Sequence, residues 1–302
     1  MSSPSLSAHF RDRQPSAIRI ASIRHAERKD GCAAINVAIG NVSLPMHPKL
    51  QERLRTVSAD GSPFAEGVVR YTATVGLPET NRAFLNILSA SGCPTSGLHS
   101  QITDGGSQAM ELVIVGLCGP AGSKERPLML IDAAYTNYKA FAQRLGRATV
   151  SITRSLSAQG EFSLPSFEEI EAMVREHRPA AIVVIPYDNP TGQLYDHETM
   201  LRLARLCVEH DIWMVSDEAY RELFYTGKHA VSVWRIEEHE VPGITGRRIS
   251  IETSSKVWNA CGLRIGALVT DSHDFHTRSV AENTAGLCSN VIGQYIFGAL
   301  AA

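Results

Sequence analysis

The chain has 302 residues, of which 44% are hydrophobic and 20% are charged, and its formal net charge at pH 7 is −2. This composition is typical of a globular protein of about two domains. The balanced charge offers no basic surface for nucleic acid or for an anionic membrane. No apolar segment approaches the roughly 18 residues of a membrane span, and the polar first residues lack the apolar core of a secretory signal. The sequence therefore predicts a cytoplasmic protein that binds neither nucleic acid nor membranes.

The cysteines indicate a reducing compartment. They are scattered along the chain and form no CxxC pair, and none has a histidine at metal-ligand spacing. The sequence therefore predicts free thiols and no metal site. The six are Cys32, Cys93, Cys118, Cys207, Cys261 and Cys288.

The N-terminal part is less regular than the rest. Residues 1–14 are polar and predict a mobile arm, whereas residues 16–28 have apolar side chains at helical spacing. A short strand is expected at residues 35–40, ending at a glycine. Two helices are then expected, at residues 45–57 and 79–90, with a loop rich in Gly and Pro before the second.

From about residue 100 strands and helices alternate, which favours parallel strands with crossover helices. Several strands are almost continuously apolar, as in a sheet that is covered on both faces. The prediction is an α/β fold with three layers, α/β/α, around a seven-stranded, mostly parallel sheet. The expected strands are residues 100–103, 128–132, 148–153, 181–185, 212–216, 249–253 and 266–270, and the helices are residues 107–117, 138–145, 166–176 and 198–210.

One lysine occupies a central place in this pattern. Lys256 follows the strand expected at residues 249–253, directly after a cluster of hydroxyl residues, and Arg264 lies eight positions further on. Ligands bind at the carboxyl ends of strands in open α/β sheets, and hydroxyls with an arginine suit an anion such as phosphate. A solvated surface charge is the alternative for a lysine considered alone.

Other strand ends carry residues of the same kind. Gly106 and Ser107 follow the first strand at a helix N-terminus, where free N–H groups favour an anion. Tyr135 follows the second and could stack on a planar ring, while Asn189 lies in a turn fixed by Pro and Gly after the fourth. Turn geometry or core packing would explain each of these residues taken singly.

Asp217 directly follows the fifth expected strand, with Tyr220 three residues later. A carboxylate at the end of an apolar strand needs a cationic partner, because an unpaired buried charge is costly. Together these strand ends offer an anion cradle, an aromatic ring, an amide, a phenol, a carboxylate, a lysine and an arginine. Pyridoxal 5′-phosphate requires this combination, with the lysine forming a Schiff base and the carboxylate keeping the ring nitrogen protonated.

The chain resembles the fold-type I pyridoxal-phosphate enzymes of the class I/II aminotransferase family. Its motifs appear in the family's order, from about residue 35 to the C-terminus. They are Tyr71 with Gly76-Leu-Pro-Glu, Gly105-Gly-Ser-Gln-Ala, Tyr135-x-x-Tyr138, Asn189-Pro-Thr-Gly, Asp217-Glu-Ala-Tyr220, Ser255-Lys256 and Gly262-Leu-Arg264-Ile-Gly266.

The resemblance implies a role for each matched residue. Lys256, Asp217 and Tyr220 would be catalytic, with Asp217 on the pyridinium nitrogen. Asn189 and Tyr220 would bind the 3′-oxygen, and Tyr135 would stack on the ring. The phosphate would be held by Gly106, Ser107, Gln108, Thr253, Ser255 and Arg264, and by Tyr71 of the neighbouring subunit in a homodimer. Gly40 and Asn189 would line the substrate pocket.

The implied activity is an aminotransferase that acts on an amino acid and a 2-oxo acid by a ping-pong mechanism. A lyase or decarboxylase with the same cofactor is the alternative, because substrate-side residues decide the outcome. A non-catalytic binding homologue is a further alternative, against which Lys256 counts.

The expected division is an N-terminal arm and small-domain segment (1–45), a large cofactor-binding domain (46–289) and the start of an interdomain helix (290–302), with the C-terminal domain absent. Two departures from the family are expected to matter. They are the end of the chain at residue 302, before the arginine that clamps the substrate carboxylate, and the charge of Asp188 beside Asn189.

Overall fold

The structure is a computed structural model that describes residues 4–35, 40, 42–223, 225, 227 and 231–302. It contains two compact units, residues 1–41 and residues 42–302. No helix in the described ranges is long and apolar enough to cross a membrane.

The described residues of the N-terminal unit form two helices, α1 (Ala8–Arg11) and α2 (Ala17–Ala26), neither of which has a buried residue. A serine begins each of them, since Ser7 and Ser16 accept hydrogen bonds from backbone N–H groups of the first turn. The helix expected at residues 16–28 is confirmed. Within the arm expected at residues 1–14, Ser7 caps one short exposed helix, α1, which the sequence analysis did not predict. The strand expected at residues 35–40 lies mostly outside the described residues.

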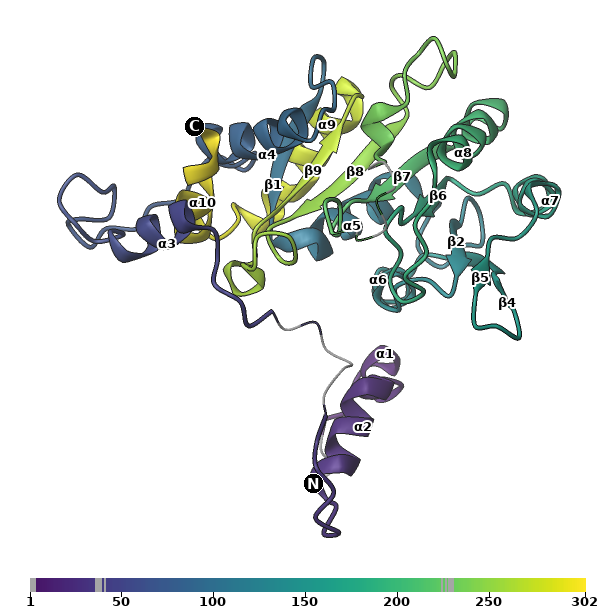
Figure 1. Cartoon of the computed structure of the whole chain (residues 1–302), viewed down its shortest axis with the longest axis horizontal. Helices are drawn as coiled ribbons and strands as arrows, with labels where there is room; N and C mark the ends of the chain where they lie inside the picture. Colours follow the sequence, from purple (N-terminus) through teal and green to yellow (C-terminus); the bar gives the residue numbers. More distant parts are fainter. Residues whose placement is uncertain (1–3, 36–39, 41, 224, 226, 228–230) are drawn as a thin grey trace. The chain divides into compact units, whose positions relative to one another are not determined.

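In the second unit, seven strands form one sheet in the order β1-β9-β8-β7-β6-β2-β3 (Figure 1). Four neighbouring pairs are parallel, whereas β9 is antiparallel to both β1 and β8. The predicted seven-stranded, mostly parallel sheet is confirmed. The strands are β1 (His99–Thr103), β2 (Leu128–Asp132), β3 (Thr149–Thr153), β6 (Ala181–Val184), β7 (Trp213–Asp217), β8 (Arg248–Thr253) and β9 (Gly266–Thr270).

Helices cover both faces of the sheet, which gives the predicted three layers. Successive residues of β2 show why, because Met129 and Ile131 belong to one hydrophobic core, and Leu128 and Leu130 to the other. The first core includes α4 (Pro78–Ala90), α7 (Phe167–His177) and α8 (His197–Glu209). The second includes α5 (Gly105–Leu117), α6 (Asn137–Arg144) and α9 (His273–Asn283).

Local sequence signals set several helix boundaries. Proline opens both α3 (Pro48–Arg55) and α4, and Ser166 with Glu169 forms a capping box at α7. The chain ends in α10 (Val291–Phe297) and a 3₁₀ turn. In the second unit, α9 was not predicted, nor was the hairpin of β4 (Ser155–Leu156) and β5 (Phe162–Ser163).

Candidate functional site

The strand directions bring the sequence-predicted residues of the second unit to one edge of the sheet. The parallel strands β2, β3, β6, β7 and β8 all end there. β1 ends there too, because it is antiparallel to β9, which is itself antiparallel to β8. The register places Gly266 opposite both Thr103 and Thr253. The loops that carry Tyr135, Asn189, Asp217 and Lys256 therefore leave the sheet at this edge.

Asp217 is the last residue of β7, and hydrogen bonds hold both of its carboxylate oxygens. Tyr138 Oη donates to Oδ2 at 2.5 Å, and the backbone N–H of Ala219 donates to Oδ1 at 3.0 Å. Burial raises the pKa of Asp217 above its ordinary value, while the Tyr138 hydrogen bond opposes this shift. The ion pairs between described residues do not include Asp217, and Glu252 and Asp188 act on it as like charges. This carboxylate would therefore be stabilised by a cation that enters the site.

Two further phenols lie within the electrostatic reach of Asp217. Burial raises the pKa of Tyr135 and of Tyr220, and the charge of Asp217 raises both further. The Tyr135 ring meets Tyr138 edge-on, with centroids 5.5 Å apart. The Asn189 amide donates to the Tyr220 hydroxyl at 3.4 Å. The predicted aromatic, amide, phenol and carboxylate are thus brought together.

The predicted anion cradle lies at the start of α5. Its first backbone N–H groups, including those of Gly106 and Ser107, have no acceptor within the helix. Gly105 has φ +72°, and a Cβ there would lie 2.5 Å from Arg264 Nη2. A Cβ at Gly266 would lie 2.6 Å from the Gly105 carbonyl carbon. Glycine at these positions therefore lets β9 and the Arg264 guanidinium approach the helix N-terminus closely.

The lysine loop adjoins this cradle. Thr253 Oγ1 donates to Ser255 Oγ at 2.8 Å, and a Cβ on Gly106 would lie 3.9 Å from Thr253 Cβ. Buried Ser254 holds the loop by donating from its N–H and its hydroxyl to the Ile265 carbonyl, each at 2.9 Å. Lys256 follows in a half-buried position.

Three predicted residues are placed differently from the rest. The side chain of Gln108 bonds within the protein, to Asp104 N at 2.7 Å and to Asn283 Oδ1 at 3.0 Å, so only its backbone faces the cradle. Tyr71 lies in an exposed loop, with 78% of its surface accessible. Gly40 belongs to the N-terminal unit, where it is exposed.

Asp188 does not present an uncompensated charge beside Asn189. Its side chain is fully buried and pairs with Arg154, with Nη2 and Oδ1 3.0 Å apart. The charge of Asp188 is thus paired inside the protein, and it still acts on Asp217 as a like charge.

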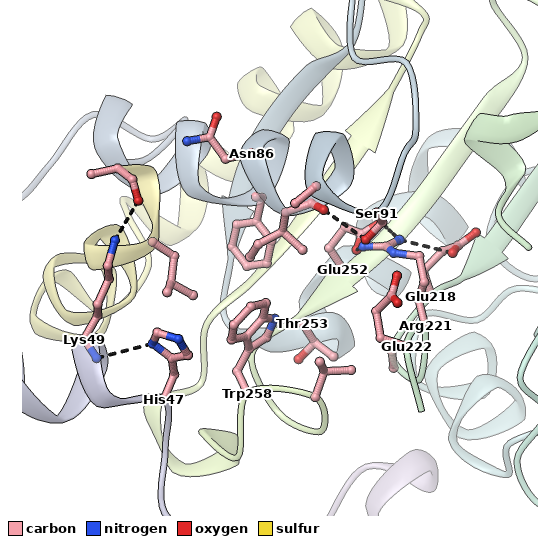
Figure 2. Close-up of a pocket in the computed structure, with 17 residues that line it drawn as sticks. His47, Lys49, Asn86, Ser91, Glu218, Arg221, Glu222, Glu252, Thr253 and Trp258 are labelled. Atoms are coloured by element: carbon pink, nitrogen blue, oxygen red, sulfur yellow. Dashed lines mark hydrogen bonds and ion pairs between the residues drawn. The ribbon is translucent and has the colours of Figure 1, made fainter. Parts of the chain in front are cut away.

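A cavity of about 630 Å³ lies beside this edge (Figure 2). At one end Arg221 lies between the carboxylates of Glu218 and Glu252, and His47 and Lys49 lie at the other. Thr253 is the sole predicted cofactor ligand among the described residues that line the cavity. The cavity therefore adjoins the predicted cofactor site and shares Thr253 with it.

Within the described ranges, one group of side chains could hold a metal ion, namely Glu171, Glu209 and His210. It lies on α7 and at the end of α8, near the start of β7, and so at the opposite edge of the sheet. Arg175 already pairs with Glu171 there.

The donors at the strand ends fit pyridoxal 5′-phosphate. The helix N-terminus of α5, the hydroxyls of Thr253 and Ser255 and the Arg264 guanidinium converge on one place, as a phosphate requires. The half-buried carboxylate of Asp217 has no cationic partner among the described residues, as a site for a pyridinium requires.

Two residues that shape this site were not predicted. Tyr138 lies in a matched motif without an implied role, and Arg154 lies outside every matched motif. The Tyr-x-x-Tyr spacing at a helix start could have indicated that both phenols face the same edge. No local signal marks Arg154, because its partners lie up to 41 positions away.

A three-layer α/β/α fold whose strand ends carry these residues at one edge of the sheet defines a fold-type I pyridoxal-phosphate transferase. The family model of the aminotransferases of class I and II matches residues 35–301. The chain therefore belongs to the aminotransferase class I and II family, whose enzymes depend on pyridoxal 5′-phosphate.

Curated relatives agree with this placement. The aspartate/prephenate aminotransferase of Thermus thermophilus is 25% identical over 259 residues, covering 85% of this chain and 64% of its own. The kynurenine–oxoglutarate transaminase 3 of Rattus norvegicus is 23% identical over 273 residues, covering 85% and 55%. The chain thus spans less than two thirds of the length of these relatives.

The fold agrees with solved structures. The aspartate aminotransferase of Thermotoga maritima superposes with a TM-score of 0.79 at 22% identity, over 98% of this chain and 75% of that chain.

Proposed function

We propose that this protein is a pyridoxal-phosphate-dependent aminotransferase that moves an amino group from an amino acid to a 2-oxo acid in two successive half-reactions. Family membership supports this activity. The single observation that carries it is Asp217, a half-buried carboxylate held by Tyr138 at the same sheet edge as Lys256 and Arg264. The reported relatives are transaminases, which favours this activity over a lyase or decarboxylase.

The bound cofactor would supply an aldehyde that bonds to amines and a ring that takes up electrons. Asp217 would accept a hydrogen bond from the ring nitrogen and keep it protonated, because its charge favours a cation there. Tyr135 would stack on the ring, and Asn189 and Tyr220 would bind the 3′-oxygen. Asn189 would also face the substrate.

The phosphate would be bound by the first turn of α5, the lysine loop and one guanidinium. Helix N-termini and arginine are both suited to this group, the first through free N–H donors and the second through its planar fork. The residues are Gly106, Ser107, Gln108, Thr253, Ser255 and Arg264.

Lys256 would bond covalently to the aldehyde carbon of the cofactor. The amine of Lys256 would also act as the base toward the proton of the substrate α-carbon, and Tyr220 would assist from the 3′-oxygen side. Catalysis would then rest on Lys256, Asp217 and Tyr220.

We further propose a cytoplasmic homodimer. Val68, Val69 and Tyr71 form an exposed, mainly apolar segment that a second copy could cover, with Tyr71 reaching the partner's phosphate site. The scattered spacing of the cysteines, without a CxxC pair, supports a reducing compartment. Gly40 would line the substrate pocket, and the boundaries near residues 45 and 289 remain proposed domain limits.

The test is a screen of amino donors with cofactor-loaded protein. The proposal expects the cofactor's aldehyde absorbance to disappear with a particular amino acid and to return with a 2-oxo acid, while the donor appears as its own 2-oxo acid. Release of ammonia or carbon dioxide in place of that exchange would identify a lyase or a decarboxylase.

A further inference from the structure

A buried ion pair lies beneath the proposed site and belongs to none of the matched motifs. Arg154 directly follows β3, and Asp188 lies in the loop after β6. Their side chains are 1% and 0% exposed, and Nη2 of the arginine lies 3.0 Å from Oδ1 of the carboxylate. The strand order β6-β2-β3 places β2 between the two strands that precede them.

Every N–H group of the Arg154 guanidinium has an acceptor. Nη1 donates to the carbonyls of Ile131 at 2.6 Å and Ala133 at 2.9 Å. Nε donates to Gln193 Oε1 at 3.2 Å, and Nη2 donates to the Tyr195 hydroxyl at 2.6 Å as well as to Asp188. Since arginine has five such donors in a fixed fork, this one side chain ties the loop after β2 to the loop after β6.

Asp188 in turn fixes the loop that follows it. Its second oxygen, Oδ2, accepts hydrogen bonds from both the N–H and the hydroxyl of Thr191. Its backbone pairs with the Gln193 carbonyl and with the Gly192 N–H, at 2.9 and 3.0 Å. The turn that presents Asn189 is thereby closed around one carboxylate.

Stability alone gives no reason for such a pair. The cost of removing two charges from water often equals or exceeds their attraction, so apolar residues of similar volume would stabilise the fold as well. Apolar residues cannot hold two loops at a set distance, whereas Arg154 does so through five directed hydrogen bonds, one of which is also the ion pair with Asp188. Tyr135 lies two residues beyond Ala133, and Asn189 lies one residue beyond Asp188.

We propose that Arg154 and Asp188 are positioning residues that set the spacing between Tyr135 and Asn189, and hence the placement of the Asn189 amide on the 3′-oxygen of the bound cofactor. This inference rests on the proposed function. Neither side chain would touch the cofactor, because both are enclosed by protein. Their effect would be transmitted by the two loops.

The test follows the pH titration of the absorbance of the bound cofactor in the full chain. A correctly placed Asn189 N–H favours the ionised 3′-oxygen, so its displacement should raise the titration midpoint. We expect Asp188→Asn to raise that midpoint by about one unit. Arg154→Lys keeps the positive charge but loses the fork, and we expect it to behave like Asp188→Asn.

Asp271→Asn is the matched control. Asp271 is also buried and paired with an arginine, Arg248, at 2.7 Å, but it follows β9 at the opposite edge of the sheet. The Asp271→Asn variant should lower the midpoint temperature of unfolding about as much as Asp188→Asn does. It should leave the pH titration of the bound cofactor unchanged. Asp188→Asn changes the loop after β6, whereas Arg154→Lys changes the residue after β3. If one variant does not fold, the other still provides the test.

The outcomes separate the two proposals. Variants of the pair that titrate like the native protein, with only stability reduced, would overturn the positioning role and leave the aminotransferase proposal intact. A native protein that gains no pyridoxal absorbance when cofactor is added would overturn both.

Discussion

The Tyr138 hydroxyl donates a hydrogen bond to the Asp217 carboxylate across 79 positions of the chain. The phenol is 1% exposed, on the first turn of α6, and it reaches the last residue of β7. A donor to a carboxylate favours its ionised form, which is the form that would hold a pyridinium.

Tyr138→Phe removes this donor and should raise the pKa of Asp217 further, because burial would then be less opposed. Cofactor affinity should therefore fall most at acidic pH, and the acidic limb of the activity profile should move to higher pH. Titrations of cofactor binding at several pH values measure this shift. Tyr187→Phe is the control, since that buried phenol bonds the Val231 carbonyl. Equal pH profiles for the two variants would refute the role of Tyr138.

Asp217→Asn should have opposite effects on the apoprotein and on the loaded protein. Folding raises the pKa of Asp217. The stability that this carboxyl group contributes is therefore fully present below its pKa in the unfolded chain, about 3.9, and it is lost as the pH rises through its pKa in the folded protein. At pH 7 the variant apoprotein should thus be at least as stable as the native one.

The loaded form of Asp217→Asn should be less stabilised by cofactor than the native protein is. Its turnover should fall by about 100-fold or more, which corresponds to roughly 3 kcal/mol of barrier. Thermal unfolding with and without cofactor, combined with turnover, measures both effects. An unchanged rate, or equal cofactor stabilisation, would contradict the pairing of Asp217 with the ring nitrogen.

Gly266→Ala should damage the phosphate cradle. The added methyl group would lie 2.6 Å from the Gly105 carbonyl carbon and 2.7 Å from the Glu252 carbonyl oxygen, so backbone must move. We expect a loss of about 1–3 kcal/mol in stability and weaker cofactor binding. Gly262→Ala in the same motif meets nothing within 4 Å and is the control. Similar cofactor affinities for the two variants would argue against the cradle.

A dimer that covers the exposed segment of Val68, Val69 and Tyr71 should dissociate when charge is introduced there. Val69, which is 55% exposed, is the position to change. Light scattering should find a dimer for the native chain and a larger monomer fraction for Val69→Lys. Leu156→Lys, at a position 61% exposed on β4, should leave the mass unchanged. A native chain that is monomeric and fully active would contradict the proposed dimer.

The sheet and most of its helices could be predicted because their signals are local. Buried strands such as β2 and β6 are continuously apolar, and the strand ends then place Asp217 and Lys256 at one edge. In α9 the buried residues are Phe275, Ser279 and Asn283, so its buried face carries too few apolar residues to reveal a helix.

Long-range pairings could not be predicted in this way. Nothing in the sequence links Arg154 to Asp188, or Tyr138 to Asp217, because each pair meets only after the strands have assembled. The sequence shows the charge of Asp188 beside Asn189, but it does not show that Arg154 pairs with this charge in the interior.

The central claim is that Lys256 bonds covalently to pyridoxal 5′-phosphate. Borohydride reduction of the cofactor-loaded protein, followed by peptide mass spectrometry, tests it directly. The account predicts a reduced pyridoxyl group on the peptide that contains Lys256, and no such group in Lys256→Ala, which should still bind some cofactor through its phosphate. A stable adduct on another lysine, or an equal yield of adduct in Lys256→Ala, would contradict the assignment of this site.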